Sequence, residues 1–212
     1  MTFLLNYADT YGSVFPLLVL IYKRNLVPKE NFILFWYFLL SIGIFSYSNY
    51  LADRTQNNLY LYHMFSIIEL TLLLQYFKKI IKSLLIKKLI NWVTILFLIA
   101  SALNILFLEK ISSLNSNTQS IEFLLLIAFC FIYYMELARS EQIIFFFKHP
   151  VFWIVTGFFI YFSITIFIFS FYKYSERTYH TFTINFWAVQ EVMYLIKNLI
   201  ITYGILCFNK KK

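Results

Sequence analysis

The sequence predicts an all-α protein, a polytopic membrane bundle of seven transmembrane helices. Of the 212 residues, 61% are hydrophobic and only 13% are charged, whereas soluble domains average about 45–50% apolar and about 25% charged residues. A soluble fold of this length would leave much of that apolar surface in water. Runs such as Phe158 to Phe162 do not alternate polar with apolar residues. They therefore argue against a spanning β-barrel and favour helices, whose backbone groups bond within one segment.

Seven apolar segments have the length of about 20 residues that a helix needs to cross the hydrocarbon core. The outer half of the first is the most polar, since it contains Asn6, Asp9, Thr10 and Gly12. Pro150 is expected in the first turn of the sixth helix, where its missing N–H is not needed. We expect a single domain over residues 1–212, with spans near 3–22, 31–51, 58–78, 88–108, 119–138, 151–172 and 183–207.

The Lys and Arg residues predict the orientation of the bundle. Thirteen of the 18 lie after the first, third and fifth spans and in the C-terminal tail, four lie in the other gaps, and Lys197 lies inside the seventh span. The positive-inside rule then places the N-terminus outside and the C-terminus in the cytoplasm of a multi-pass membrane protein. The net charge of +8 is expected to meet anionic lipid headgroups at the cytoplasmic face rather than nucleic acid.

The segments between the spans predict no further domain. They are too short to fold alone, and residues 140–147 are expected to form a small interfacial stretch before the sixth span. The N-terminal segment has no basic n-region, so a cleavable signal peptide is not expected. Cys130 and Cys207 both lie in apolar runs, which predicts no disulfide framework.

Ionisable residues inside the spans are the candidates for function, because a charge in the bilayer is costly. The third span contains His63 and Glu69, the fifth contains Glu122, and the seventh contains Glu191 and Lys197. In the predicted orientation His63 and Glu122 lie in the outer third, while Glu69 and Glu191 lie near the middle. Polar residues inside the spans are therefore concentrated toward the exterior.

Helical spacing gathers these residues on two faces. Gly157 and Tyr161 of the sixth span lie one turn apart, where a small residue permits close helix packing. On the third span, one face carries Tyr62, Ser66, Glu69 and Tyr76. On the seventh, one face carries Trp187, Glu191, Tyr194, Asn198 and Thr202. The predicted exterior-facing ligand pocket is lined by His63, Glu69, Glu122, Trp187, Glu191 and Tyr194.

Other roles for the buried polar residues stay open. They can bond across helices as structural contacts, or form an ion or proton path. Lys197 with a third-helix glutamate also matches the arrangement of a retinal Schiff base and its counter-ion. However, Met193 stands one turn before Lys197, where microbial rhodopsins place Asp. Lys197 is therefore expected to snorkel toward the cytoplasmic headgroups or to pair with a Glu.

Known catalytic motifs give little support for an enzyme. The chain has no His-Glu-x-x-His metal motif and no Gly-x-Ser-x-Gly nucleophile elbow, and its four glycines form no phosphate loop. We therefore expect no catalytic residue, no metal and no cofactor. A lipid-active enzyme that uses Glu69, Glu122 or Glu191 as an acid or base remains an alternative.

Three segments of the chain carry a resemblance to a known family. They are Phe15-Pro16-Leu17-Leu18, the third-span run from Leu61 to Glu69, and His149-Pro150-Val151-Phe152-Trp153-Ile154 with Gly157 and Tyr161-Phe162-Ser163 after it. These segments resemble an uncharacterised seven-helix integral membrane protein family of Bacteroidota. The resemblance covers nearly the whole chain and implies a small bacterial inner-membrane protein without soluble domains. It carries over no catalytic residue. The chain departs from the group at Lys197, which precedes an Asn198 that fits the group's polar position better.

Together these observations predict a receptor-like or sensor module. Its exterior-facing polar pocket would bind a small molecule or lipid, and its basic inner loops would contact a separate cytoplasmic or membrane signalling partner. The alternatives are a membrane-embedded lipid-active enzyme and a structural subunit of a membrane complex.

Overall fold

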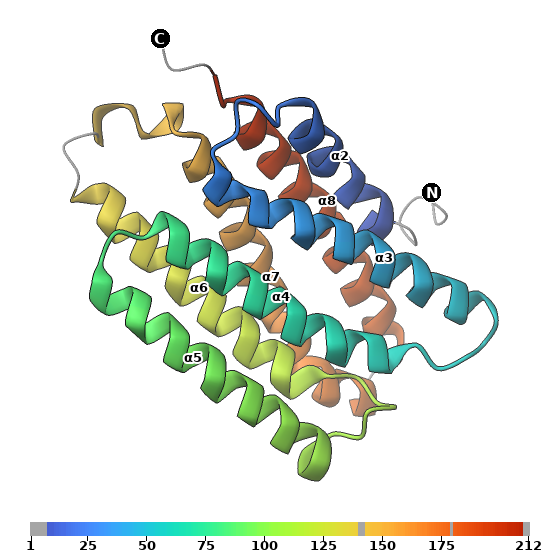
Figure 1. Cartoon of the computed structure of the whole chain (residues 1–212). Helices are drawn as coiled ribbons and strands as arrows, with labels where there is room; N and C mark the ends of the chain where they lie inside the picture. Colours follow the sequence, from blue (N-terminus) through green and yellow to red (C-terminus); the bar gives the residue numbers. More distant parts are fainter. Residues whose placement is uncertain (1–7, 140–142, 179, 210–212) are drawn as a thin grey trace.

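The computed structural model describes residues 8–139, 143–178 and 180–209, and all regular structure in these ranges is helical (Figure 1). Three short segments supplement the long helices: a 3-10 helix at Lys29–Phe32, a π-helix at Asn104–Leu108 and a 3-10 helix at Ile143–Lys148. The seven long helices are α2 (Ala8–Tyr22), α3 (Ile33–Asp53), α4 (Leu59–Ile80), α5 (Leu84–Leu103), α6 (Ser116–Ala138), α7 (Pro150–Thr178) and α8 (His180–Leu206).

Among the described residues, five helical segments are long and apolar enough to cross a membrane, which is the pattern of a multi-pass membrane protein. Thr10–Tyr22 is a shorter apolar helix, and α4 packs with the others in the same bundle. The five segments are Lys29–Asp53, Leu84–Leu108, Ser116–Ala138, Pro150–Ser170 and Trp187–Leu206.

Most helices begin and end close to the bounds of the predicted spans, but some helix ends differ from the prediction. Helix α7 begins at Pro150, as predicted. The predicted loop 173–182 is instead helical on both sides of residue 179, because α7 runs to Thr178 and α8 begins at His180. Residues 3–7 of the predicted first span, residues 140–142 of the predicted interfacial stretch and residue 179 of that loop lie outside the described residues.

Helix α5 begins four residues before its predicted start because its first turn has two sources of capping. Ser83 Oγ accepts a bond from the backbone N of Ile86 at 3.5 Å. From α6, the carboxylate of Glu136 accepts bonds from the backbone N of Lys82 at 2.8 Å and of Ser83 at 3.0 Å. Free N–H groups at a helix N-terminus need such acceptors, and here a neighbouring helix supplies them.

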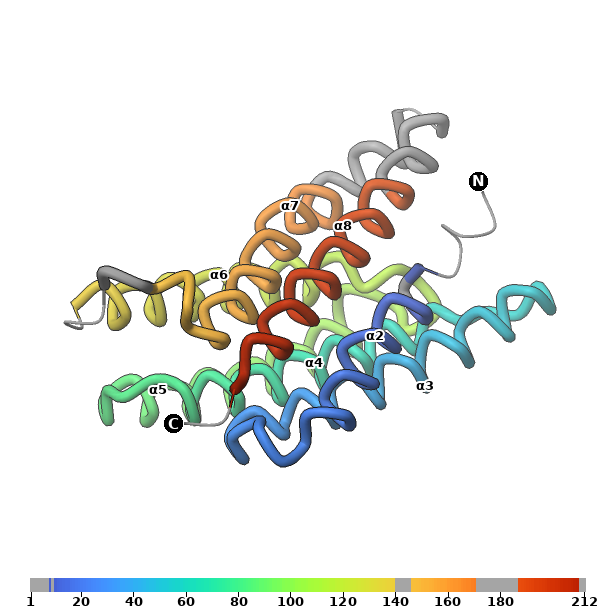
Figure 2. The backbone as a smooth tube through the Cα atoms, turned by 90° about the horizontal axis from the view of Figure 1, so that it is seen from above, coloured from blue at the N-terminus to red at the C-terminus, as the bar shows by residue number. Residues whose placement is uncertain are grey.

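Six helices close into a ring. Helix α8 packs against α7 and α2, α2 against α3, α3 against α4, α4 against α6, and α6 against α7. Figure 2 shows α8 crossing the bundle between α7 and α2. Helix α5 lies outside this ring, on α4 and α6 (Figure 1). Its outer face exposes Leu85, Trp92, Leu96 and Ile99, as expected where lipid is the solvent.

The interior of the ring contains apolar and aromatic side chains and one polar layer. Tyr37, Phe38, Leu70, Phe158 and Phe162 are fully buried in it. Two glycines allow α7 and α8 to approach closely. A Cβ atom at Gly157 would lie 3.0 Å from the carbonyl oxygen of Lys197, and one at Gly204 would lie 2.9 Å from that of Pro150. The predicted close packing at Gly157 is therefore confirmed.

Candidate functional site

Lys197 lies at the centre of the polar layer. Its side chain is 0% exposed, and its Nζ donates a hydrogen bond of 2.9 Å to the hydroxyl of Tyr37 on α3. The expectation that Lys197 snorkels to the headgroups is therefore wrong. The side chain extends across the ring instead, because hydrogen-bonding and aromatic partners lie within its reach there.

Three tyrosine rings surround the ammonium group of Lys197. Its Nζ lies 3.6 Å from the ring centroid of Tyr194, 4.4 Å from that of Tyr161 and 5.4 Å from that of Tyr37. All three distances are within the range of cation–π attraction, which is worth about 2 kcal/mol or more when the cation is desolvated. Aromatic faces from α8, α7 and α3 thus replace much of the hydration that Lys197 loses.

Tyr37 links Lys197 to the first of two buried carboxyl groups. A phenolic hydroxyl accepts and donates at once, and that of Tyr37 accepts from Lys197 while donating to Glu69 Oε1 at 2.8 Å. Glu69 lies on α4 and is 4% exposed. The expected pairing of Lys197 with a glutamate is therefore present, but it runs through a tyrosine.

The second buried carboxyl group belongs to Glu122 of α6, which is 0% exposed. Its Oε2 accepts a hydrogen bond from the hydroxyl of Ser66 on α4, and its Oε1 is buried without a hydrogen-bond partner. Two carboxyl groups, one from α4 and one from α6, are therefore buried inside the ring together with the amine of Lys197.

The network reaches the remaining helices of the ring through tyrosines. The hydroxyl of Tyr194 on α8 lies 2.8 Å from Ser13 Oγ on α2, and α7 contributes Tyr161. Every helix of the ring thus supplies at least one side chain. We call this set the buried network: Ser13, Tyr37, Ser66, Glu69, Glu122, Tyr161, Tyr194 and Lys197.

The six residues predicted to line a ligand pocket fall into two groups. Glu69, Glu122 and Tyr194 belong to the buried network, and Glu191 is near enough to act electrostatically on Lys197. His63 lies elsewhere, with its Nε2 bonded at 3.0 Å to the carbonyl oxygen of Ser113. Trp187 packs its ring edge-on against Phe169, 6.0 Å between centroids.

Sequence reasoning missed Tyr37, which joins the charged groups. Tyr37 lies in a run of aromatic residues, Phe35 to Phe38, where no polar neighbour marks one face of the helix. In hindsight its hydroxyl was the only signal, since a buried tyrosine hydroxyl usually finds a hydrogen-bond partner.

The three ionisable side chains of the buried network, Lys197, Glu69 and Glu122, are at most 4% exposed. None of the four cavities described in the placed part of the chain is lined by Lys197, Glu69 or Glu122. Within the same described ranges, no group of three His, Cys, Asp or Glu residues is placed to hold a metal ion. The arrangement buries one amine and two carboxyl groups among hydroxyl groups that come from the surrounding helices.

Comparison of the chain with family models, with curated proteins and with solved structures gave no match.

Proposed function

We propose that the chain is a receptor-like or sensor module of a bacterial inner membrane, with seven spans and the N-terminus outside. It binds a small molecule or lipid on its exterior side and signals through a separate partner at the cytoplasmic face. The observation that carries this proposal is the buried network, in which side chains from all six helices of the ring surround one lysine and two carboxyl groups.

A buried ion pair is a poor way to stabilise a bundle. Well-packed apolar residues of similar volume often stabilise a protein as well as, or better than, such a pair, and charges inside the membrane mark functional sites by default. Lys197, Tyr37 and Glu69 form a chain of two hydrogen bonds across three helices. A displacement of one of these helices breaks a bond, so the network favours two discrete arrangements over gradual deformation.

The enzyme alternative has less support. A catalytic carboxyl group must reach its substrate, and Glu69 and Glu122 are buried away from the cavities of the described residues. A structural subunit would use the same network only to hold the helices in place. The sensor and the structural subunit therefore differ in one respect: in a sensor, a change in the buried network alters the contact with the partner protein.

The orientation can be tested by cysteine labelling in a background with Cys130→Ala and Cys207→Ala. Lys82 and Lys110 are both exposed, and the positive-inside rule places them on opposite sides of the membrane. In spheroplasts, a membrane-impermeant maleimide is expected to label the Lys110→Cys variant directly. It should label the Lys82→Cys variant only after the membrane is permeabilised. The reverse pattern would overturn the orientation and, with it, the exterior ligand site.

The signalling role can be tested by photo-crosslinking in cells. A crosslinking amino acid at the exposed position Lys88 is expected to capture one partner protein, whereas the same group at Lys110 is not. Glu69→Gln removes the negative charge opposite Lys197 and should change the yield of the Lys88 adduct. Asp53→Asn, an acid-to-amide change at an exposed position of α3, is the matched control and should leave the yield unchanged.

Two results would contradict the proposal. A partner that is captured equally by the wild type and by Glu69→Gln, and that copurifies in fixed ratio, identifies a structural subunit. Capture of no protein from Lys88 removes the separate signalling partner altogether.

A further inference from the structure

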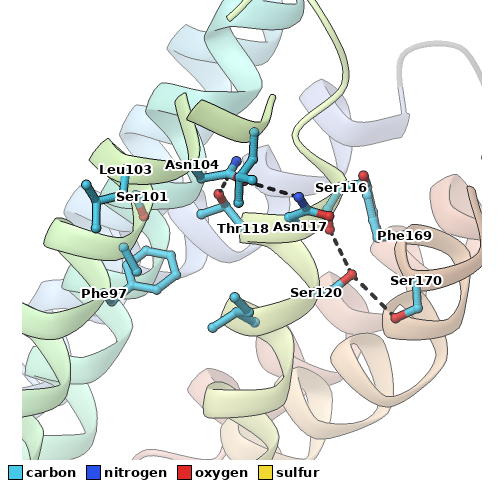
Figure 3. Close-up of a pocket in the computed structure, with 13 residues that line it drawn as sticks. Phe97, Ser101, Leu103, Asn104, Ser116, Asn117, Thr118, Ser120, Phe169 and Ser170 are labelled. Carbon is cyan, nitrogen blue, oxygen red and sulfur yellow. Dashed lines mark hydrogen bonds between the residues drawn. The ribbon is translucent and has the colours of Figure 1, made fainter. Parts of the chain in front are cut away.

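A cavity of about 600 Å³ lies among α5, α6 and α7, outside the buried network. Figure 3 shows it at the end of α5 and the beginning of α6, with Phe169 and Ser170 of α7 on its far side. This volume falls within the range of about 300–1,000 Å³ that is usual for small-molecule sites. In the proposed orientation the cavity lies on the exterior half of the bundle.

One part of the cavity is polar and uncharged. Asn104 Nδ2 donates to Thr118 Oγ1 at 3.0 Å and to Glu109 Oε2 at 2.9 Å. Across the cavity, Ser170 Oγ lies 3.4 Å from Ser120 Oγ (Figure 3). Asn104 begins the π-helical turn Asn104–Leu108, and such turns occur frequently at functional sites.

Ser101 is the polar group of this site that lacks a partner. It lines the cavity, its side chain is 2% exposed, and its Oγ has no hydrogen bond. A buried hydroxyl without a partner loses the hydrogen bonds that water would give it, at a cost of about 1–3 kcal/mol. A ligand hydroxyl in the cavity would supply the missing bond.

The other part of the cavity is apolar and faces the surroundings of the bundle. Phe97 and Phe169 are buried in its wall, while Leu103, Leu108 and Ile121 line it and are also exposed on the outer surface. The exposed side chains belong to helices whose outer faces are apolar, so the mouth opens where lipid is the solvent. A ligand can therefore enter sideways from the membrane.

We propose that this cavity binds a single-chain amphiphile whose headgroup is uncharged and bears hydroxyl groups. The chain would lie against Phe97 and Ile121, and the headgroup would bond to Ser101 and Asn104. None of the residues that line the cavity is Lys or Arg, so a phosphate or carboxylate headgroup would have no cationic partner. The carboxylate of Glu109, which accepts hydrogen bonds from Asn104 and Ser116, would also repel an anionic headgroup.

The test uses the full-length chain in nanodiscs, with 1-monooleoylglycerol as the probe and native mass spectrometry as the readout. One molecule is expected to bind per protein. Ala100 lines the cavity, whereas Ala102, on the same helix and also exposed, does not. Ala100→Trp should therefore abolish binding, and Ala102→Trp should preserve it.

The headgroup contact has its own pair of variants. Ser101→Ala is expected to weaken binding about 2- to 10-fold, the ratio that corresponds to one lost hydrogen bond. Ser41→Ala is the matched control, since Ser41 on α3 is also buried with an unpartnered Oγ but does not line the cavity. The comparison of Ser101→Ala with Ser41→Ala tests whether the amphiphile binds in this cavity even if Ala100→Trp fails to fold.

Two outcomes would overturn the inference. Equal binding by Ala100→Trp and Ala102→Trp, or by Ser101→Ala and Ser41→Ala, would place the amphiphile elsewhere. Oleoyl lysophosphatidic acid that binds as tightly as monooleoylglycerol would show that the headgroup assignment is wrong. Neither outcome bears on the buried network, so the sensor proposal is tested separately.

Discussion

Lys197→Met is expected to lower the free energy of unfolding by about 3–5 kcal/mol, the usual effect of removing one partner from a buried ion pair. The substitution removes the bond from Nζ to the Tyr37 hydroxyl and the cation among three tyrosine rings. It leaves the carboxyl group of Glu69, which accepts from the same Tyr37 hydroxyl, without a cation beside it. The measurement is unfolding in a mild detergent, followed by fluorescence against temperature and denaturant.

The second variant in this experiment removes the negative charge as well. Lys197→Met combined with Glu69→Gln should recover part of the lost stability, because no uncompensated charge is then buried, and the coupling between the two sites should exceed about 0.5 kcal/mol. Lys88→Met, at an exposed position, is the control and should change stability by less than about 0.5 kcal/mol. If the double variant is as unstable as the sum of the two single variants, Lys197 and Glu69 are not a charge pair.

The long helices could be predicted because an apolar run of about 20 residues has few other structures available to it. The ends of α7 and α8 could not. The residues from Lys173 to His180 are polar and read as a loop, yet the helices continue through most of them. Polar composition indicates contact with water, and a helix end that extends beyond the membrane meets that condition equally well.

The two carboxyl groups of the buried network were predicted from the sequence, but the contacts that link them to other helices were not. Glu69 and Glu122 stood out because an acid inside a span is rare. That Ser66 donates to Glu122 depends on how α4 and α6 pack, which helical spacing within one span does not determine. For Lys197, depth along α8 suggested the nearest headgroups, whereas its three aromatic neighbours come from α3, α7 and α8.

The cavity beside α5 could not be predicted from the sequence either, because it too depends on how separate helices pack. Its residues come from the ends of two helices and from the far part of α7, and the serines and asparagines among them are too common near loops to be singled out. The signal that matters, an unpartnered hydroxyl on Ser101, exists only after the three helices are placed together.

Gly157→Ala is expected to lower the free energy of unfolding by about 1–3 kcal/mol, the usual range for overpacking. The added Cβ would lie 2.8 Å from Ile201 Cγ1 and 3.0 Å from the carbonyl oxygen of Lys197. The isoleucine side chain can rotate, but the carbonyl oxygen moves only if α8 moves. Gly43→Ala on α3 is the matched control, because nothing lies within 4 Å of its added Cβ. That variant should be neutral or up to about 1 kcal/mol more stable.

The same substitution tests whether packing and charge act together. A shift of α8 away from α7 displaces the residue whose Nζ bonds to Tyr37, so part of the loss in Gly157→Ala should come from the buried network. In a Lys197→Met background that part is already gone, and Gly157→Ala should then be less destabilising than in the wild type. Unfolding measured under the same conditions for the four proteins gives the coupling. If the stability losses of Gly157→Ala and Lys197→Met simply add, the close approach at Gly157 holds α7 and α8 together without positioning Lys197. The sensor proposal would then lose the evidence that packing of α7 is coupled to the buried network.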